Sequence, residues 1–290
     1  MSELFDAAFF AKLNRLQLAM HMRLDQGQSG GRKSTAKGSS VEFSDFREYL
    51  PGDDIRRIDW NVYGRLDKLY VKQFMEEKEA FYHVFIDTSA SMDYGEEKKS
   101  VMALRLAAVF AWIVQKQLDR VELLTFAEGR LDKMSPVSGR SSFQRTLNEL
   151  EQITFSGNTQ MNEAVRRCPI HGRGICILIS DFLEPEGVDE TIRYLTFQRQ
   201  EVLLVQVLAR EEVSFEGEGT VAFCDMETGQ EVRVSLTRQN IAAYEQAMKK
   251  HQENLQILAK RYGCSYLSVI SDEDMEKVVF ETLQQKGIFG

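Results

Sequence analysis

The sequence predicts an α/β fold in which a mostly parallel sheet carries helices on both of its faces. Two observations lead to this prediction. First, the sequence contains short apolar segments of the kind found in strands that are buried on both sides. These segments are residues 80–87, 120–127, 174–180 and 201–209. Second, segments with helical periodicity separate the strands, and an alternation of strand and helix favours parallel pairing.

The other elements of the predicted domain follow the same alternation. Residues 98–118 are apolar almost all round and should form a central helix. Further helices are expected at residues 141–150, 160–167, 188–200, 237–262 and 272–285. A short edge strand is expected at residues 131–134 and a last strand at 264–269. Residues 210–236 interrupt the pattern and predict a small β insertion that turns at residues 227–229.

The first 79 residues differ in character from the rest. Residues 3–24 carry an apolar stripe at steps of three or four, which predicts an amphipathic helix that docks on another surface. The stripe consists of Phe9, Leu13, Leu16, Met20 and Leu24. Residues 26–40 are rich in Gly and Ser, as in a flexible loop, and residues 43–76 favour a hairpin with a strand at 69–75. We therefore expect a leader, 1–79, followed by an α/β domain, 80–290.

The charge of the chain limits its partners. A net charge of −8 over 290 residues argues against general binding of nucleic acid. Residues 12–37 depart from this balance, with six Lys or Arg and one Asp. This strip fits a solvated tether, and it also fits a surface that contacts phosphates, lipid headgroups or an acidic partner.

Cysteine usage and the N-terminal composition indicate a cellular compartment. Four cysteines occur without a Cys-x-x-Cys pair, so we expect reduced thiols rather than a disulfide framework or a zinc knuckle. The N-terminus contains acidic residues early and no long apolar run, which is typical of neither a signal peptide nor a transmembrane anchor. We expect a cytoplasmic protein with no transmembrane segment.

Polar side chains collect where the predicted strands end. The first strand runs into Asp87, Ser89 and Ser91, in an Asp-x-Ser-x-Ser arrangement, and the strand at 174–180 is followed by Asp181. Between them Thr159 lies in a Gly-containing loop, where it could also cap or begin a helix. Because ligands of open parallel sheets bind beyond the carboxyl ends of the strands, we expect these five residues to meet there.

This set of three hydroxyls and two carboxylates suits a divalent cation. Mg²⁺ prefers six oxygen ligands and retains several waters, and Mn²⁺ or Ca²⁺ could take its place. Hydroxyls would bind the ion directly, the carboxylates would hold bound waters, and a carboxylate from a partner could take the open position. The simpler interpretation is that the two serines cap a helix and that Asp87 merely ends its strand.

A second polar cluster precedes the sheet, in the stretch EYLPGDDIRRIDW at residues 48–60. We expect it to be a structural brace, or a surface for a partner, rather than a metal site. In this interpretation Asp53 or Asp54 caps a helical turn, and two arginines neutralise nearby carboxylates and compete with any cation. Ile55, Ile58 and Trp60 would pin the turn to the core. The polar and aromatic members are Asp53, Asp54, Arg56, Arg57, Asp59 and Trp60.

At Asp87, Ser89, Ser91, Thr159 and Asp181 the sequence resembles a von Willebrand factor A-type domain with a metal-ion-dependent adhesion site. The segment EFSDFREYLPGDDIRRIDWNVYGR ahead of IDTSASM is also similar to the bacterial family catalogued as domain of unknown function fifty-eight. The resemblance implies a von Willebrand factor A-like, Rossmann-type sheet with an N-terminal leader. It also implies an AAA+ ATPase of the MoxR class as partner, in chaperone-like maturation or metal-insertion systems.

We therefore expect a non-enzymatic, metal-dependent protein-interaction module whose client supplies a carboxylate to the metal. One alternative is a phosphotransferase or hydrolase with Asp87 as nucleophile, although enzymes of that kind use Asp-x-Asp and Ser89 stands at the second position. Another is a membrane-surface or nucleic-acid adaptor that uses residues 12–37. The four histidines are dispersed, and we expect them to be solvated or satisfied in the core.

Overall fold

The computed structural model describes residues 13, 41–76, 80–170, 172–184, 187–214, 219–224 and 231–288. The chain forms two compact units, which are treated separately below. One unit comprises Met1–Leu24 and Ala80–Gly290, and the other comprises Asp25–Glu79. The end of the smaller unit coincides with the predicted boundary at residue 79, whereas the first 24 residues group with the larger unit.

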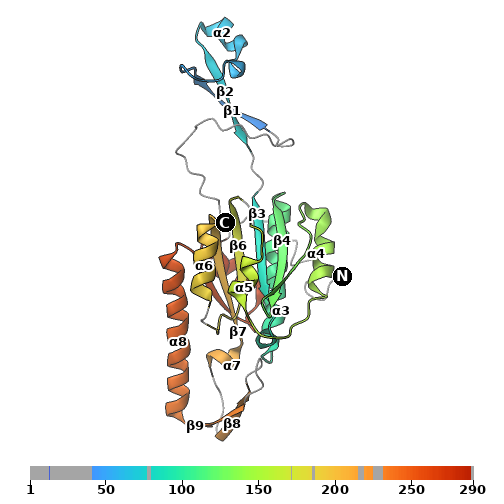
Figure 1. Cartoon of the computed structure of the whole chain (residues 1–290), viewed down its shortest axis with the longest axis vertical. Helices are drawn as coiled ribbons and strands as arrows, with labels where there is room; N and C mark the ends of the chain where they lie inside the picture. Colours follow the sequence, from blue (N-terminus) through green and yellow to red (C-terminus); the bar gives the residue numbers. More distant parts are fainter. Residues whose placement is uncertain are drawn as a thin grey trace. The chain divides into compact units, whose positions relative to one another are not determined.

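The larger unit is built on a six-stranded sheet with the order β10-β7-β6-β3-β4-β5. Figure 1 shows β3 between β6 and β4. The strands are β3 (Phe81–Asp87), β4 (Arg120–Ala127), β5 (Arg130–Lys133), β6 (Gly174–Ser180), β7 (Gln200–Leu208) and β10 (Ser265–Ile270). Every pairing is parallel except that of β5, which pairs with β4 in the antiparallel sense. The prediction of a mixed α/β fold with a mostly parallel, Rossmann-like sheet is therefore confirmed.

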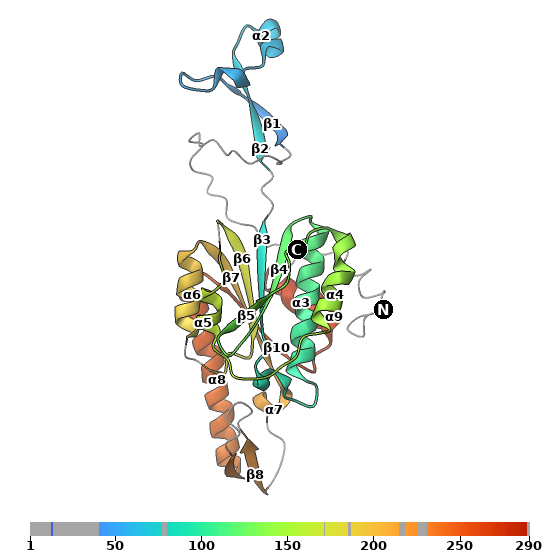
Figure 2. The same ribbon diagram turned by 45° about the vertical axis from the view of Figure 1, so that its right-hand side comes forward.

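Helices cover both faces of the sheet, as Figure 2 shows. On one face lie α3 (Lys99–Lys116), α4 (Phe143–Leu150) and the closing segment, which consists of α9 (Met275–Lys277), a π-helical turn (Val278–Thr282) and α10 (Leu283–Gln285). On the other lie α5 (Met161–Arg166), α6 (Val188–Phe197) and α8 (Arg238–Arg261). The sheet thus separates two cores, and successive residues of β3 alternate between them.

The strand β3 illustrates this alternation. Val84 and Ile86 point into the core shared with α3, whereas Phe85 points into the core shared with α5 and α6. All three side chains are fully buried. Because both faces are covered, the strand reads as a continuous apolar run instead of an alternating one. The polar residues on such a strand are therefore exceptions that need an explanation.

Short elements connect the layers. They are η2 (Ala90–Asp93), η3 (Arg140–Ser142), α7 (Arg210–Val213), β8 (Gly219–Cys224) and β9 (Glu231–Leu236). The strands β8 and β9 form the expected hairpin of the insertion, but α7 at its start was not predicted. The closing helix begins at Met275 rather than near residue 272, because the Asp274 carboxylate caps it by accepting from two backbone amides.

One residue of the predicted leader, Leu13, is described within the larger unit. Leu13, on the predicted apolar stripe, is helical and fully buried, and it belongs to the core that contains α3. The other residues of the predicted helix at 3–24, and the basic strip at 12–37 apart from Leu13, lie outside the described residues. Among the residues that are described, no helix is both long and apolar enough to cross a membrane.

The smaller unit contains an antiparallel pair of strands, β1 (Val41–Glu48) and β2 (Tyr70–Glu76), as predicted for the hairpin-like segment. Between them lie η1 (Ile55–Arg57) and α2 (Trp60–Leu66). Two carboxylates start these helices, because Asp54 accepts from the backbone of Arg56 and Asp59 accepts from Asn61 and Val62. The expected capping role of this acidic stretch is confirmed for Asp54 and holds also for Asp59.

One detail of the predicted brace is wrong, and one ion pair of the stretch involves β1. Asp53 pairs with Arg47 at 2.8 Å, because Arg47 on β1 lies beside the turn that contains Asp53. Ile55 and Trp60 are each 64% exposed, so they do not pin the turn to a core. Only Ile58 of the predicted apolar trio is buried, where it bridges to β2. The spacing of these side chains fitted one face, but the short helices leave most of them outside.

A candidate metal site at the carboxyl edge of the sheet

The strand order places a binding edge between β3 and β6. From β3 the chain continues to β4 on one side, and it later returns to β6 on the other side. Adjacent strands whose connections diverge in this way leave a crevice at their carboxyl ends, where ligands of open α/β sheets bind. Asp87 is the last residue of β3, and Asp181 directly follows β6. The topology therefore brings the two predicted carboxylates to the same crevice.

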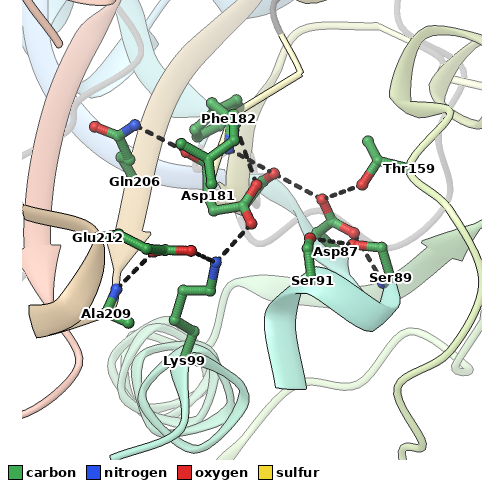
Figure 3. Close-up of polar contacts among 12 residues, drawn as sticks. Asp87, Ser89, Ser91, Lys99, Thr159, Asp181, Phe182, Gln206, Ala209 and Glu212 are labelled. Atoms are coloured by element: carbon green, nitrogen blue, oxygen red, sulfur yellow. Dashed lines mark hydrogen bonds and ion pairs between the residues drawn. The ribbon is translucent and has the colours of Figure 1, made fainter. Parts of the chain in front are cut away.

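Asp87 is the centre of a hydrogen-bonded cluster (Figure 3). Its side chain is fully buried. The Oδ1 atom accepts from the backbone amide of Ser89 at 3.0 Å. The Oδ2 atom accepts from the hydroxyl of Thr159 at 2.9 Å and from the hydroxyl of Ser180 at 2.7 Å. These donors fix the carboxylate in one orientation, and they come from three separate segments of the chain.

Burial has a strong effect on the ionisation of Asp87. It raises the pKa of the carboxyl to about 6, and the negative charge of Asp181 contributes in the same direction. The hydrogen bonds from Ser180 and Ser89 lower the pKa but do not outweigh burial. A nearby cation would favour the ionised form, so a metal ion would lower this pKa again. The site is therefore electrostatically receptive to positive charge.

The two predicted serines lie next to Asp87 on the turn that contains η2. The hydroxyl oxygens of Ser89 and Ser91 are 3.1 Å apart. Ser89 is buried, whereas Ser91 is partly exposed. Ser89 stands at the N-cap position of η2, but its side chain makes no capping hydrogen bond there. The simpler interpretation, in which these serines serve as helix caps, is therefore not supported for Ser89.

Thr159 reaches Asp87 from a loop that is held close to β3. Two backbone hydrogen bonds join the segments, from Ala90 to the carbonyl of Gly157 and from Ser156 to the carbonyl of Thr88, both at 2.8 Å. Gly157 has a φ of +78°, and a Cβ there would lie 2.6 Å from the Cγ of Glu128. The positive φ favours glycine at this position, and a larger residue would also require the Glu128 side chain to move.

The prediction that Thr159 caps or begins a helix is wrong. The N-cap position of α5 belongs to Gln160, and the Thr159 hydroxyl instead donates to Asp87. All five predicted residues nevertheless lie in one cluster, because Asp181 acts on the charge of Asp87 and the other three lie on the two adjoining loops. Asp53, Asp54, Asp59 and the other residues of the acidic stretch belong to the smaller unit, Asp25–Glu79.

Sequence reasoning missed a buried lysine beside this cluster. Lys99, the first residue of α3, is fully buried, and its Nζ atom donates to Asp181 Oδ2 at 2.8 Å and to Glu212 Oε1 at 2.6 Å (Figure 3). Glu212, on α7, also accepts from the backbone of Ala209 at 2.8 Å. Lys99, Asp181 and Glu212 are called the lysine triad below. It connects the candidate site to α7 at the start of the insertion.

The triad keeps charge inside the protein by pairing it. Burial lowers the pKa of the Lys99 ammonium, but its contacts with the two carboxylates outweigh burial and raise the pKa above its ordinary value. Burial raises the pKa of Glu212, although Lys99 opposes this shift. The backbone carbonyl of Asp181 is fixed as well, by the Gln206 side chain at 2.8 Å. The ammonium therefore compensates part of the negative charge at this edge.

The arrangement can supply oxygen ligands to a hard cation. Hydroxyl and carboxylate oxygens are the ligands that Mg²⁺ and Ca²⁺ prefer, and here they converge on a crevice. A cleft of about 360 Å³ is lined by neighbouring residues that include Thr88, Glu128 and Ser156, but none of the five predicted residues lines it. The donor set itself fits a divalent cation, and no nitrogen or sulfur ligand takes part in it.

Comparison with known proteins identifies a family. The family model described as "Protein of unknown function DUF58" matches residues 45–254, and the chain belongs to this family. Uncharacterized proteins of Mycobacterium bovis (Mb1516) and of two strains of Mycobacterium tuberculosis (MT1527 and Rv1480) are 27% identical to the chain over 276 residues. These alignments cover 93% of this chain and 87% of each relative.

The solved structures to which the chain shows similarity include two from Bacteroides. The conserved hypothetical protein BatB from Bacteroides thetaiotaomicron has a TM-score of 0.47 and 19% identity, covering 71% of this chain and 98% of that one. An aerotolerance-related membrane protein from Bacteroides fragilis has a TM-score of 0.45 and 18% identity, covering 72% and 98%. The pilus adhesin SpaC of Lactobacillus rhamnosus GG has a TM-score of 0.45 and 12% identity, covering 73% of this chain and 30% of that one.

Proposed function

We propose that this member of the DUF58 family is a von Willebrand factor A-like protein-interaction module that works through a bound divalent cation and catalyses no reaction. The cation is Mg²⁺, with Mn²⁺ or Ca²⁺ as substitutes. One observation carries the proposal: the residues of an adhesion-type metal motif, predicted from three separate stretches of sequence, lie together at the carboxyl edge of the sheet. Asp87 is the residue around which the others are arranged.

The residues present fit such an ion. In our proposal the hydroxyls of Ser89, Ser91 and Thr159 would hold the metal, and Asp87 and Asp181 would hold water bound to it. The ion would supply an electrophilic position for an incoming carboxylate. Neutral hydroxyl ligands quench little of the ionic charge, so the site retains its attraction for an acidic side chain of the partner.

The lysine triad supports a binding role for the cluster. Because Lys99 is paired with both Asp181 and Glu212, part of the acidic charge near the site is already balanced. A bound dication would bring the formal charge of Asp87, Asp181, Glu212 and Lys99 to zero, so an anionic group of the partner would not be repelled. The same ammonium holds one oxygen of Asp181 in place. We infer that Lys99 is a positioning residue for Asp181.

The partner class in this proposal comes from the family resemblance. An AAA+ ATPase of the MoxR class would act with the chain in chaperone-like maturation, and the client protein would supply the carboxylate. The mycobacterial relatives are uncharacterized, so the proposal rests on the site and on the resemblance.

A phosphotransferase or hydrolase is less well supported by the same geometry. Such a reaction needs a group that transfers protons to or from the reacting oxygen. The hydrogen-bond donors to Asp87 are the backbone amide of Ser89 and the hydroxyls of Thr159 and Ser180. None of these transfers protons efficiently near neutral pH, whereas all of them suit a carboxylate that orients metal-bound water.

The test combines metal binding with partner binding. Isothermal titration with Mg²⁺ should give one site per chain in the wild type, and Asp87→Asn should abolish it while preserving the side-chain volume. Asp93→Asn is the matched control, because Asp93 is a nearby carboxylate that pairs with the exposed Lys98 instead of facing the site. Capture of the MoxR-class ATPase should require Mg²⁺ and be lost with EDTA and with Asp87→Asn. Equal Mg²⁺ affinity in the wild type and Asp87→Asn would refute the proposal, and so would turnover of a phosphate ester that depends on Asp87.

A further inference from the structure

Another polar cluster, separate from the Asp87 cluster, lies within the sheet and away from its carboxyl edge. His83 on β3 and Glu122 on β4 are direct neighbours in the parallel register. Cys168 follows the end of α5 and belongs to the core on the same side of the sheet as Phe85. One potential ligand atom from each of these three residues lies within 4.8 Å of the other two. The cluster thus joins an imidazole, a carboxylate and a thiol from three separate segments.

The imidazole of His83 is buried without the hydrogen bonds that a buried ring normally makes. The residue is 5% exposed, and its Nδ1 atom has no hydrogen-bond partner among the residues that the structure describes. Its Nε2 atom is 3.6 Å from Glu122 Oε2, which is too long for a hydrogen bond. The expectation that the histidines are solvated or satisfied is therefore wrong for His83. A buried polar atom without a partner needs an explanation, and an ion that binds there is one such explanation.

Electrostatics make His83 suitable as a ligand. Burial lowers its pKa to about 4, and the nearby positive charge of Lys133 contributes to the shift. The ring is therefore neutral at physiological pH and retains a lone pair on one nitrogen. The Glu122 side chain is only 13% exposed and lies next to this ring. A neutral imidazole beside a largely buried carboxylate is a common pair of metal ligands.

A lysine ammonium already lies at this cluster. Lys133, on the edge strand β5, places its Nζ atom 3.9 Å from the sulfur of Cys168. Its charge also lowers the pKa values of His83 and Glu122 relative to burial alone. Lys133 is exposed to solvent and can move away. The Lys133 ammonium thus places a positive charge beside the Cys168 thiol and the Glu122 carboxylate, and it can be displaced toward solvent.

We propose that His83, Glu122 and Cys168 bind a zinc ion, or another borderline-soft dication, at a site distinct from the Asp87 cluster. Zinc takes these ligand types, namely imidazole nitrogen, thiolate sulfur and carboxylate oxygen, and it prefers four ligands in a tetrahedron. Ligand atoms around such an ion are roughly 3–4 Å apart, so small side-chain movements close the present cluster around it. Water would complete the coordination, and Lys133 would turn outward.

Sulfur and nitrogen ligands separate this site from the oxygen-only cluster at Asp87. Magnesium and calcium prefer oxygen ligands, whereas thiolate and imidazole favour zinc. Binding requires that the Cys168 thiol lose its proton, although burial raises the pKa of that thiol to about 11 in the metal-free protein. A directly bound cation provides the compensating charge. The two sites are therefore expected to take different metals without competition.

The position of Cys168 gives the zinc site a structural consequence. Cys168 follows α5 at its carboxyl end, and Thr159 precedes α5 by two residues. A metal bond from Cys168 to His83 and Glu122 would join the carboxyl end of α5 to β3 and β4. The loop that carries Thr159 would then extend from a helix anchored at its far end. Zinc would act as a clamp on the segment that supplies one hydroxyl to the Asp87 cluster.

The test is a zinc titration of the full chain, purified without metal, against a chromophoric chelator. The wild type should bind one Zn²⁺ per chain, and Co²⁺ in its place should produce a thiolate-to-cobalt charge-transfer band. Cys168→Ser should remove the band, and Cys168→Ser and Glu122→Gln should each weaken zinc binding by about 100-fold or more. Cys264→Ser is the matched control, since Cys264 is a free thiol outside the cluster, and it should bind zinc as the wild type does.

Two further variants keep the test decisive. Lys133→Met should tighten zinc binding, because it removes a competing ammonium, whereas a misfolded site would weaken it. Asp87→Asn should leave zinc binding unchanged, so a failure of the magnesium proposal would not affect this one. The proposal is overturned if the wild type binds no Zn²⁺, if Cys168→Ser binds it as tightly as the wild type, or if Asp87→Asn abolishes the binding.

Discussion

Two polar residues on the same strand, Asp87 and His83, are buried in contrasting ways. Asp87 ends β3 and accepts hydrogen bonds from a backbone amide and two hydroxyls. His83 lies four residues earlier, and its Nδ1 atom has no partner among the described residues. Burial pushes both groups toward their neutral forms, raising the pKa of the acid to about 6 and lowering that of the base to about 4.

The difference lies in what surrounds each group. The carboxyl edge of a parallel sheet collects loops, and loops supply hydroxyls and backbone amides to Asp87. The middle of a strand is bordered by other strands whose backbone groups already pair, so His83 depends on side chains of β4, β5 and the end of α5. A satisfied network fixes one geometry, whereas a sparse one leaves ligand atoms available. We expect the two clusters to respond differently to mutation and to pH.

The largest expected effect concerns the lysine triad beside Asp87. Lys99→Met would leave Asp181 and Glu212 buried without their cation, and this should lower the free energy of unfolding by about 3–5 kcal/mol. Lys98→Met is the control, because Lys98 pairs with Asp93 at the surface and should change stability by at most about 1 kcal/mol. Urea unfolding of both variants measures the difference. Equal losses would show that Lys99 is not held by a buried network.

The pH dependence of Asp87 gives the next effect. In the folded state its pKa is raised to about 6, so between the unfolded and folded pKa values the native protein binds more protons than the unfolded chain. Stability from this group is present at low pH and is lost as pH rises through about 6. In EDTA, the wild type should lose about 2 kcal/mol relative to Asp87→Asn between about pH 4 and pH 7. Parallel stability curves for the two proteins would contradict the raised pKa, and Mg²⁺ should reduce the loss.

His83 should show the opposite sign. Its folded pKa is lowered to about 4, so the unfolded chain binds more protons below the ordinary histidine pKa. The stability from neutral His83 is full above about pH 7 and declines as pH falls. In EDTA, the wild type should lose about 1 kcal/mol relative to His83→Gln between about pH 7 and pH 5.5. Chemical unfolding at these two pH values measures the change, and an absent or reversed difference would show that the ring is not buried in its neutral form.

The smallest effect is expected at Lys133. This exposed side chain makes one long contact with the Cys168 sulfur, so Lys133→Met should change the stability of the metal-free protein by no more than about 0.5 kcal/mol. Thermal unfolding in EDTA measures the change. A loss of several kcal/mol would show that Lys133 is a structural partner of the cluster, which would remove the reason to regard it as a displaceable cation.

Much of the larger unit follows from the sequence, because its signals are local. The strands are continuous apolar runs, and Asp87 and Asp181 follow two of them directly. Once parallel pairing is assumed, these residues must share an edge, whatever the register. The Asp-x-Ser-x-Ser spacing adds the two serines, since both fall on the turn after β3. Thr159 was found by its chain order and its glycine, although its role as a cap was wrong.

The residues that were missed depend on distant contacts. Lys99 contacts Asp181, which lies 82 residues later in the sequence, and Glu212, which lies 113 residues later. Glu212 also lies on a short helix that the sequence pattern does not predict. The signal available was a lysine at the start of a helix that is otherwise apolar almost all round. His83 and Glu122 become neighbours only through the exact register of β3 and β4. Strand periodicity places a residue on a face, but it does not choose the neighbour beside it.

The burial of Leu13 has a consequence for how the chain is divided. This side chain precedes the smaller unit in sequence, yet it lies within the core that α3 and the closing helices share. The larger unit is therefore a discontinuous domain. The smaller unit is an insertion within its sequence, instead of an extension before its first residue. A fragment that starts at residue 80 would lack a leucine that fills the core, which costs about 2–5 kcal/mol when such a side chain is removed. Deletion of residues 25–79, with a short joining loop, would retain that leucine. Comparing the stability of this variant with that of the fragment starting at residue 80 would separate the contribution of the inserted unit from that of the core.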